Sequence, residues 1–269
     1  MPLTRISYWH LPMDVRDQIE AITGLITSAQ PTSAGLNSSV AALLHTAGGR
    51  YFVKALPTDH RWVWTQASEA NIAQYVRPVA PALCTRIVTQ EWDVLVFEAL
   101  EGNQADYTPG SPDLRSVARL LTQISEIPCP ATELRDAPQR LQQYADEADL
   151  HHFAGQALLH TDLNNANIII SKDQARIVDW GWATRGAPWL DPAYWVIWLI
   201  AAGHEPLHAE KLAATVRSWQ HASDKGLDAF AAANVRLWAE IAGPQPDTFT
   251  APLMAAARRW HDYRLSLRR

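Results

Sequence analysis

The sequence is poor in cysteine and in long apolar runs. Its 269 residues contain two cysteines, Cys84 and Cys129, and neither belongs to a C-x-x-C pair. We therefore expect two free thiols in a reducing cytoplasm. The longest apolar run, Trp195–Ala202, is far shorter than the roughly 20 residues that cross a bilayer, so no membrane partner is expected. The N-terminus also lacks the apolar core of a signal peptide, which again favours the cytoplasm.

Blocks of basic residues are missing as well. The 23 basic and 28 acidic residues give a net charge of −5. Nucleic acid is therefore excluded as the main partner, because phosphate binding needs a positive stripe. No repeat of 20–50 residues occurs, and no G-x4-G-K-[ST] motif, which excludes a P-loop enzyme. What is present is 48% apolar residues, enough for one large domain or two associated lobes.

The first hundred residues predict a short helix followed by mostly β-structure. Apolar positions recur at helical spacing near the N-terminus, and later runs are short and rich in β-branched and aromatic residues. The predicted elements are a helix over Met13–Ser28, strands over Val40–Leu44 and Arg50–Leu56 joined by a turn at residues 47–49, a helix over Arg61–Val76 and a strand over Trp92–Ala99.

The remainder of the chain predicts helices. Gly, Pro and polar residues gather in Leu100–Pro112, so we expect a boundary there, between lobes 1–100 and 101–269. A β-rich lobe followed by a helical lobe is an α+β arrangement. The expected helices are Pro112–Ile127, Ala137–Leu150, Asp191–Ala202, Pro206–Ala222, Leu227–Ala242 and Thr250–Leu267, with short strands at Ile168–Ile170 and Arg176–Val178.

One stretch carries the chemistry, Leu158–Pro192. It contains His160-x-Asp162-x4-Asn167 and, after two short apolar segments, Asp179-Trp180-Gly181. Two carboxylates and an amide oxygen form an all-oxygen set that suits Mg²⁺ rather than zinc. One carboxylate remains to orient or deprotonate a hydroxyl. His160 favours a structural role close to the Asp179 backbone, and His151 and His152 favour a solvated loop over a metal site.

The spacing matches the template for phosphoryl transfer, which also requires a lysine on a strand and a glutamate on the next helix. Lys54 ends the apolar segment Arg50–Lys54. Glu69 is the only acidic residue between Arg61 and Gln90, and it lies in the next predicted helix. We therefore predict that Glu69 holds Lys54 against the α- and β-phosphates of a nucleotide.

These motifs resemble the aminoglycoside phosphotransferase family of kinase-like small-molecule phosphotransferases. The resemblance runs from about Gly35 to Asp191 and is strongest in H-T-D-L-N-N-A-N, I-V-D-W-G and L-D-P-A. It implies a bilobal protein-kinase-like fold, ATP or GTP as the phosphoryl donor and Mg²⁺ as cofactor. Two departures stand out: Thr161 replaces the usual glycine between His and Asp, and the nucleotide loop is not G-x-G-x-x-G.

The resemblance also implies roles for individual residues. Asp162 would be the catalytic base, with Lys54 and Glu69 as the phosphate-binding pair, and Asn167 and Asp179 would hold Mg²⁺. Backbone groups in a hinge would bind adenine, and a polar loop would cover the phosphates. The residues implied for nucleotide binding are Gly35, Ser38, Ser39, Lys54, Glu98, Ala99 and Leu100.

The acceptor is expected to be a small molecule with a hydroxyl group. Only eleven residues lie between Asp179 and Asp191, with no A-P-E motif, which argues against a protein kinase. Residues 101–269 carry 16 basic and 20 acidic residues, compatible with a cationic acceptor such as an aminoglycoside or another basic antibiotic. A metabolic kinase for choline-like, sugar or amino-alcohol acceptors is the main alternative, and a nucleotide-binding pseudokinase scaffold is a second.

Tryptophan is unusually abundant, with twelve in the chain and five between Trp180 and Trp198. Trp195 and Trp198 lie three apart on an apolar helix, which favours core packing. Trp182 and Trp189 fall in the segment between Asp179 and Asp191. We predict that these two rings, with Asp162 and Asp191, contact the acceptor.

Overall fold

The computed structural model describes residues 5–32, 38–172 and 174–268, and every structural statement below refers to them. The chain divides into two compact units. The first comprises Met1–Gly102 together with Ile177–Trp182, and the second comprises Asn103–Arg176 and Ala183–Arg269. The segment Ile177–Trp182 thus returns to the first unit from far along the sequence, carrying Asp179 with it.

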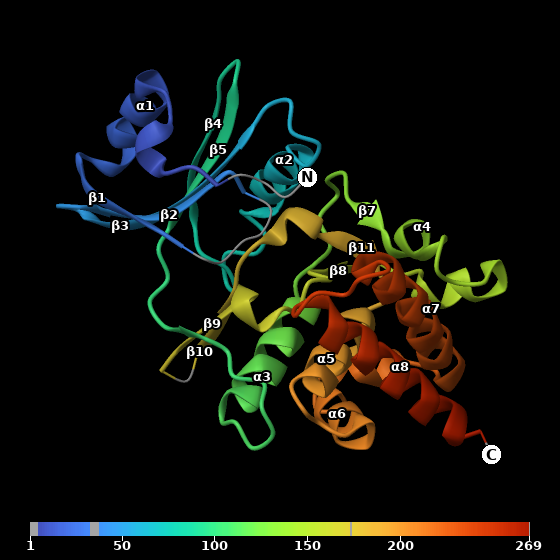
Figure 1. Cartoon of the computed structure of the whole chain (residues 1–269). Helices are drawn as coiled ribbons and strands as arrows, with labels where there is room; N and C mark the ends of the chain where they lie inside the picture. The colour runs from blue at the N-terminus through green and yellow to red at the C-terminus, as the bar shows by residue number, and fades with distance from the viewer. Residues whose placement is uncertain (1–4, 33–37, 173, 269) are drawn as a thin grey trace. The chain divides into compact units, whose positions relative to one another are not determined.

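The first unit is built on a five-stranded antiparallel sheet (Figure 1). Its strand order is β1-β2-β3-β5-β4. The strands are β1 (Ile26–Pro31), β2 (Val40–Thr46), β3 (Gly49–Pro57), β4 (Leu83–Val88) and β5 (Trp92–Glu98), and the helices are α1 (Met13–Thr23) and α2 (Trp64–Ile72).

The predicted strands Val40–Leu44, Arg50–Leu56 and Trp92–Ala99 are confirmed, but two helices are shorter than predicted. The first helix ends at Thr23, because Gly24 has φ 81° and Ile26 then begins β1, so the predicted end at Ser28 is wrong. The predicted helix Arg61–Val76 is regular only over α2. Strands β1 and β4 were not predicted.

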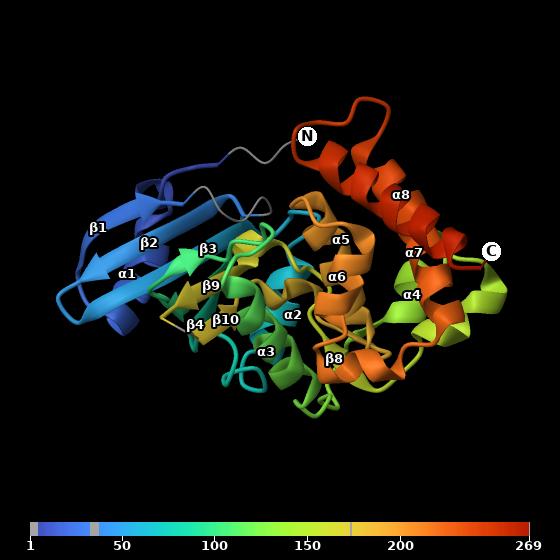
Figure 2. The ribbon, with the colours of Figure 1, turned by 90° about the horizontal axis from the view of Figure 1, so that it is seen from below.

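Side chains alternate between the two faces of the sheet along β3, and the two faces differ in their surroundings. Val53 and Ala55 belong to a buried apolar cluster that also contains Val15 and Ile19 of α1. Figure 2 shows α1 with the strands of the sheet. Lys54, between them in sequence, must point to the other face, where its side chain forms an ion pair with Glu69 of α2. One face therefore builds the core, and the other presents Lys54.

The second unit is mainly helical, with two three-stranded sheets, β10-β9-β6 and β7-β11-β8. The strands are β6 (Asn103–Gln104), β7 (Arg135–Asp136), β8 (Ala157–Leu159), β9 (Ile168–Ser171), β10 (Gln174–Ile177) and β11 (Thr184–Gly186). The helices are α3 (Asp113–Ser125), α4 (Ala137–Leu141), α5 (Leu190–Ala201), α6 (Pro206–Ala213), α7 (Asp224–Ala242) and α8 (Thr250–Ser266).

Two predicted helices of this unit are wrong in length. The prediction Ala137–Leu150 survives only as α4, and a 3-10 helix at Glu147–Phe153 follows Asp146, whose backbone is extended. The prediction Pro206–Ala222 ends at Ala213, because Val216 is extended before a second 3-10 helix at Arg217–His221. The other four predicted helices are confirmed within a few residues.

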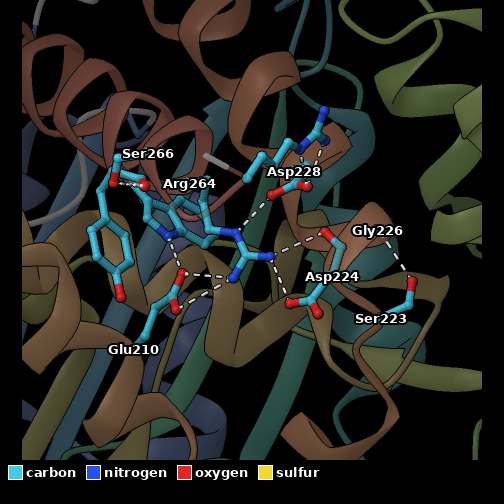
Figure 3. A network of polar contacts seen from close by, with 10 residues as sticks. Glu210, Ser223, Asp224, Gly226, Asp228, Arg264 and Ser266 are labelled. Atoms are coloured by element: carbon cyan, nitrogen blue, oxygen red, sulfur yellow. Dashed lines mark hydrogen bonds and ion pairs between the residues drawn. The ribbon is translucent and has the colours of Figure 1, made fainter.

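The C-terminal helices are joined by a buried arginine. Arg264 of α8 donates from Nε to Asp228 and from Nη2 to Asp224, both on α7, and forms an ion pair with Glu210 of α6 (Figure 3). The Arg264 side chain is only 6% exposed. Among the described residues, no helix has both the length and the apolar character that a bilayer crossing requires.

Candidate active site

The loop that joins β8 to β9 in the second unit brings Asp162 and Asn167 together. The Asn167 amide nitrogen donates to Asp162 Oδ2 at 2.9 Å and to the Asp162 carbonyl at 3.3 Å. Asp162 Oδ1 accepts the backbone N–H of Asn164 at 3.3 Å. Because the amide nitrogen of Asn167 is used in this way, its amide oxygen is the atom that remains to ligate a cation.

Asp191, in the first turn of α5, anchors this loop. Its Oδ2 accepts the backbone N–H of His160 and its Oδ1 accepts that of Thr161, each at 2.8 Å. Asp191 is 3% exposed, and burial raises its pKa although these bonds and the charge of Arg140 oppose the shift. Both oxygens hold backbone, so the prediction that Asp191 contacts the acceptor is wrong: it positions the loop instead.

Two buried aromatic side chains support the same loop. His160 is fully buried, and its Nδ1 accepts the backbone N–H of Asp162 at 3.3 Å, which places the ring proton on Nε2. The Tyr107 hydroxyl donates to the Leu163 carbonyl at 3.1 Å. Burial raises the Tyr107 pKa well above its usual value, and the charge of Asp162 adds to the shift. Tyr107 was missed because it lies in the stretch predicted as a boundary loop.

Lys54, Glu69 and Asp179 meet in the first unit. Lys54 Nζ lies 2.9 Å from Asp179 Oδ1 and also forms an ion pair with Glu69 Oε2. The Lys54 and Glu69 side chains are 11% and 5% exposed, whereas Asp179 keeps 29% of its side chain exposed. Burial alone would lower the Lys54 pKa, but the two carboxylates outweigh it and raise the pKa above its usual value. Lys54 is therefore a fixed positive charge at neutral pH.

The backbone around Asp179 is strained and tightly packed. Asp179 has φ 67°, a left-handed conformation that costs a residue with a side chain about 1–3 kcal/mol. The next N–H, of Trp180, donates to Glu69 Oε1 at 3.3 Å. Gly181 packs so closely on α2 that an added Cβ would lie 2.9 Å from the Thr65 Cβ. The Asp-Trp-Gly sequence thus fits against α2, and its glycine is needed for that approach.

A buried glutamine that the sequence did not reveal supports Lys54. Gln66 of α2 is 1% exposed, and its amide nitrogen donates to the carbonyls of Lys54 and Asp93 at 3.3 and 3.0 Å. These bonds tie α2 to the neighbouring strands β3 and β5, so Glu69 is held opposite Lys54. The sequence feature that could have identified Gln66 is its position one helical turn before Glu69, on the same face of the helix.

The residues expected to bind nucleotide differ in burial and in whether their backbone N–H groups are already hydrogen-bonded. Ser39 is buried, and its backbone N–H donates to the Ala55 carbonyl at 3.0 Å. The N–H groups of Glu98 and Ala99 donate to Ala82 and Arg50 carbonyls at 2.9 and 3.2 Å. Those three N–H groups are therefore committed within the unit. The remaining predicted residues are Ser38, which is buried, Leu100, which is half-buried, and Gly35, which lies outside the described residues.

Two predicted acceptor-binding tryptophans have different surroundings. Trp189 is 3% exposed and packs against Phe153 and Phe230, so the prediction that it stacks on an acceptor is wrong. Trp182 is half-buried in the first unit, with its ring centroid 5.3 Å from Trp62 and 5.0 Å from Trp64. Trp62 and Trp64 were not predicted to belong to the site.

Comparison by sequence finds no matching family model and no matching curated protein. Comparison by structure does find matches. Choline kinase LicA from Streptococcus pneumoniae has a TM-score of 0.66 at 14% identity, covering 94% of this chain and 99% of the other. A thermostable mutant of aminoglycoside phosphotransferase APH(4)-Ia, in a ternary complex with AMP-PNP and hygromycin B, has a TM-score of 0.58 at 13% identity, covering 92% of this chain and 99% of the other.

A macrolide 2'-phosphotransferase from Brachybacterium faecium also matches, with a TM-score of 0.52 at 16% identity over 92% of this chain and 98% of that one. Identities this low establish the fold alone. The chain therefore has the α+β, protein-kinase-like bilobal fold that kinase-like small-molecule phosphotransferases share. The fold class that the sequence predicted is confirmed.

Proposed function

We propose that the protein is a phosphotransferase that transfers the γ-phosphoryl group of ATP or GTP to a hydroxyl of a small molecule. The observation that carries the proposal is the buried Lys54–Glu69 pair with Asp179 held beside it by Lys54. Such a fixed cation with a partly exposed carboxylate suits a metal-bound triphosphate. The structural neighbours support this, since one was solved in a ternary complex with AMP-PNP and hygromycin B.

We assign Mg²⁺ to Asp179 and Asn167. The donor set fits, because Asp179 offers a carboxylate that is 29% exposed and Asn167 offers its amide oxygen while its nitrogen donates to Asp162. Oxygen ligands supplemented by phosphates and water are what Mg²⁺ takes in nucleotide enzymes. When bound, the ion supplies charge neutralisation on the phosphates. Lys54 would bind the α- and β-phosphates.

We assign the acceptor hydroxyl to Asp162. The hydroxyl oxygen would form a bond to the γ-phosphorus while the bond from that phosphorus to the β–γ bridging oxygen breaks, and the hydroxyl proton would pass to the Asp162 carboxylate. Asp162 is held for this task by Asn164 and Asn167 on its two oxygens. Positioning of the carboxylate is thus the contribution of the loop.

For the acceptor we propose a basic antibiotic such as an aminoglycoside, with a choline-like or other metabolic acceptor as the second candidate. Trp182 with Trp62 and Trp64 supports both, because aromatic faces attract cations and the Arg61 guanidinium already lies 4.9 Å from the Trp62 ring centroid. A panel of aminoglycosides, macrolides, choline, amino alcohols and sugars, each with ATP, separates the two by ADP release. Turnover of sugars alone would contradict a cationic acceptor.

Replacing Asp162 tests the function itself. In Asp162→Asn we expect nucleotide affinity within about twofold of wild type and phosphoryl transfer lower by about 10²–10⁴-fold, because the proton acceptor is lost. The matched control is Asp146→Asn, since Asp146 is 70% exposed. Unchanged turnover would contradict the role of Asp162. A wild-type protein that binds nucleotide but never releases ADP would instead indicate the scaffold alternative.

Replacing Asp179 tests the metal. In Asp179→Ala we expect Mg²⁺-dependent nucleotide binding to disappear, because the carboxylate ligand is gone. Calorimetric titration with ATP, with and without Mg²⁺, measures it for the variant and for wild type. An unchanged effect of Mg²⁺ in the variant would show that the metal binds elsewhere.

A further inference from the structure

The residue before Asp162 has an unfavourable backbone conformation. Thr161 has φ 69°, and the described non-glycine residues with positive φ are Thr161, Lys172 and Asp179. A β-branched residue is a particularly poor fit to this left-handed region. Thr161 is also only 9% exposed. Such a conformation persists only where its surroundings impose it. The contacts that hold Thr161 therefore also set the backbone direction at the next residue, Asp162.

Two side chains of the second unit bind Thr161, one at its backbone N–H and one at its side-chain hydroxyl. Asp191 Oδ1 accepts its backbone N–H at 2.8 Å. From another element, Arg140 Nη1 donates to Thr161 Oγ1 at 2.7 Å and to Thr184 Oγ1 at 2.5 Å. Arg140 lies on α4, and Thr184 is fully buried in β11, opposite Leu159 of β8. Arg140 therefore links the Thr161 side chain to the strand next to β8, which leads into the loop.

We propose that Arg140 is a positioning residue, which holds Thr161 in its left-handed conformation and so fixes the direction of Asp162. The inference rests on the proposed function, in which Asp162 receives the hydroxyl proton. It explains how threonine can occupy a position where glycine, which has no Cβ, would adopt the same φ without strain. In this proposal Arg140 acts on the reacting groups only through Thr161.

The alternative is that Arg140 only ties α4 to β11 through Thr184. The two roles differ in their dependence on Thr161. If Arg140 counteracts strain at Thr161, then Thr161→Gly should make Arg140 dispensable, because glycine needs no clamp. If Arg140 is merely a tie between α4 and β11, the loss of Arg140 should have the same effect whether residue 161 is threonine or glycine.

Deuterium exchange of the peptides that cover residues 158–168 tests the clamp without any assay of activity. In Arg140→Met we expect exchange of the His160 and Thr161 amides to be about tenfold faster than in wild type. In Arg140→Met/Thr161→Gly it should return to within about threefold of the Thr161→Gly single variant. Arg135→Met is the matched control, since Arg135 of neighbouring β7 lies beside Thr184 in the sheet register, and it should leave this segment unchanged. Equal acceleration in Arg140→Met with either residue at 161 would overturn the proposal.

Turnover then distinguishes positioning from stability. With MgATP, and water as the acceptor, we expect kcat of Arg140→Met to fall about 10–30-fold per folded molecule, with KM for ATP within twofold and with recovery in the double variant. Arg140→Lys, which keeps a donor, should lie between. A loss of folded protein with unchanged kcat would overturn the positioning role. If wild type releases no ADP with water or with any acceptor of the panel, the proposed function fails, while the exchange experiment still decides whether Arg140 holds Thr161 in its conformation.

Discussion

Two buried cations, each surrounded by carboxylates, occur in different units of the molecule and serve different ends. Lys54 is paired with Glu69 and Asp179. Arg264 is paired with Glu210, Asp224 and Asp228 (Figure 3). Formal charge hardly separates them: one lysine against two carboxylates gives −1, and one arginine against three gives −2, or −1 when Arg268, which also binds Asp228, is included. Charge alone therefore does not mark a functional cluster.

Backbone geometry separates the two clusters. Glu210, Asp224, Asp228 and Arg264 all lie on regular helices, and the guanidinium donates from Nε and both Nη atoms. Nothing in that arrangement is strained. Asp179, by contrast, follows β10 with φ 67° and is 29% exposed. Asp224 is more exposed still, at 92%, so exposure does not separate the clusters, whereas the strained backbone at Asp179 does. This is why we place function at Lys54 and structure at Arg264.

The largest expected effect is loss of turnover in Lys54→Met. Removal of the fixed positive charge should lower kcat/KM for ATP by about 10³-fold, equivalent to about 4 kcal/mol, because the phosphates lose a preorganised partner. ADP release at several ATP concentrations measures it. Lys211→Met, an exposed lysine on α6, is the control. A loss of less than about tenfold in kcat/KM would contradict the functional role that we give to Lys54.

Arg264→Met should have the opposite profile. We expect a loss of about 3 kcal/mol in the free energy of unfolding, because Glu210, 14% exposed, would lose its ion-pair partner and Asp228, 10% exposed, would keep only Arg268. Turnover per folded molecule should stay within twofold. Urea denaturation measures the first and ADP release the second. The control is Arg236→Met, since Arg236 pairs with Asp146 at the surface and should cost less than about 1 kcal/mol.

Much of the fold could be predicted because hydrophobic periodicity determines it. The strands around the turn at 47–49 and the helix α7 follow directly from alternating or helical apolar patterns. The short strands β7, β8 and β11 could not be predicted. Each has two or three residues, too few for a period, and each exists only because a distant segment pairs with it.

The candidate site also contains residues that local sequence patterns predict and residues that they do not. Asp162, Asn167 and Asp179 were found from spacing along the chain, and the structure places Asn167 on Asp162 and Asp179 on Lys54. Gln66 and Arg140 could not be found, since their partners lie on elements whose placement no local pattern encodes. The partners of Arg264 could not be predicted for the same reason: an arginine on a basic helix end has the same local sequence whether its partners are water or three carboxylates.

The smallest expected effect is a change in how the free energy of unfolding depends on pH. Burial raises the pKa of Glu69, and its ion pair with Lys54 opposes the shift. In Lys54→Met burial and the charge of Asp179 still raise the pKa of Glu69, and only the hydrogen bond from Trp180 opposes them. The folded state should therefore bind the Glu69 proton more tightly than the unfolded state does. Where the folded state holds more protons, stability falls as pH rises, so the cost of the variant should grow between pH 5 and 8, by at most about 1.4 kcal/mol per pH unit.

Urea denaturation at each pH measures this slope for wild type, Lys54→Met and Lys54→Met/Glu69→Gln. The double variant should lose the extra slope, because the glutamine side chain has no proton to release in this pH range. Arg264→Met, in which Asp228 keeps Arg268 as a partner, is measured in the same way for comparison. Parallel stability curves for wild type and Lys54→Met would mean that Glu69 does not depend on Lys54 for its charge, and pH dependence would then not separate the two clusters.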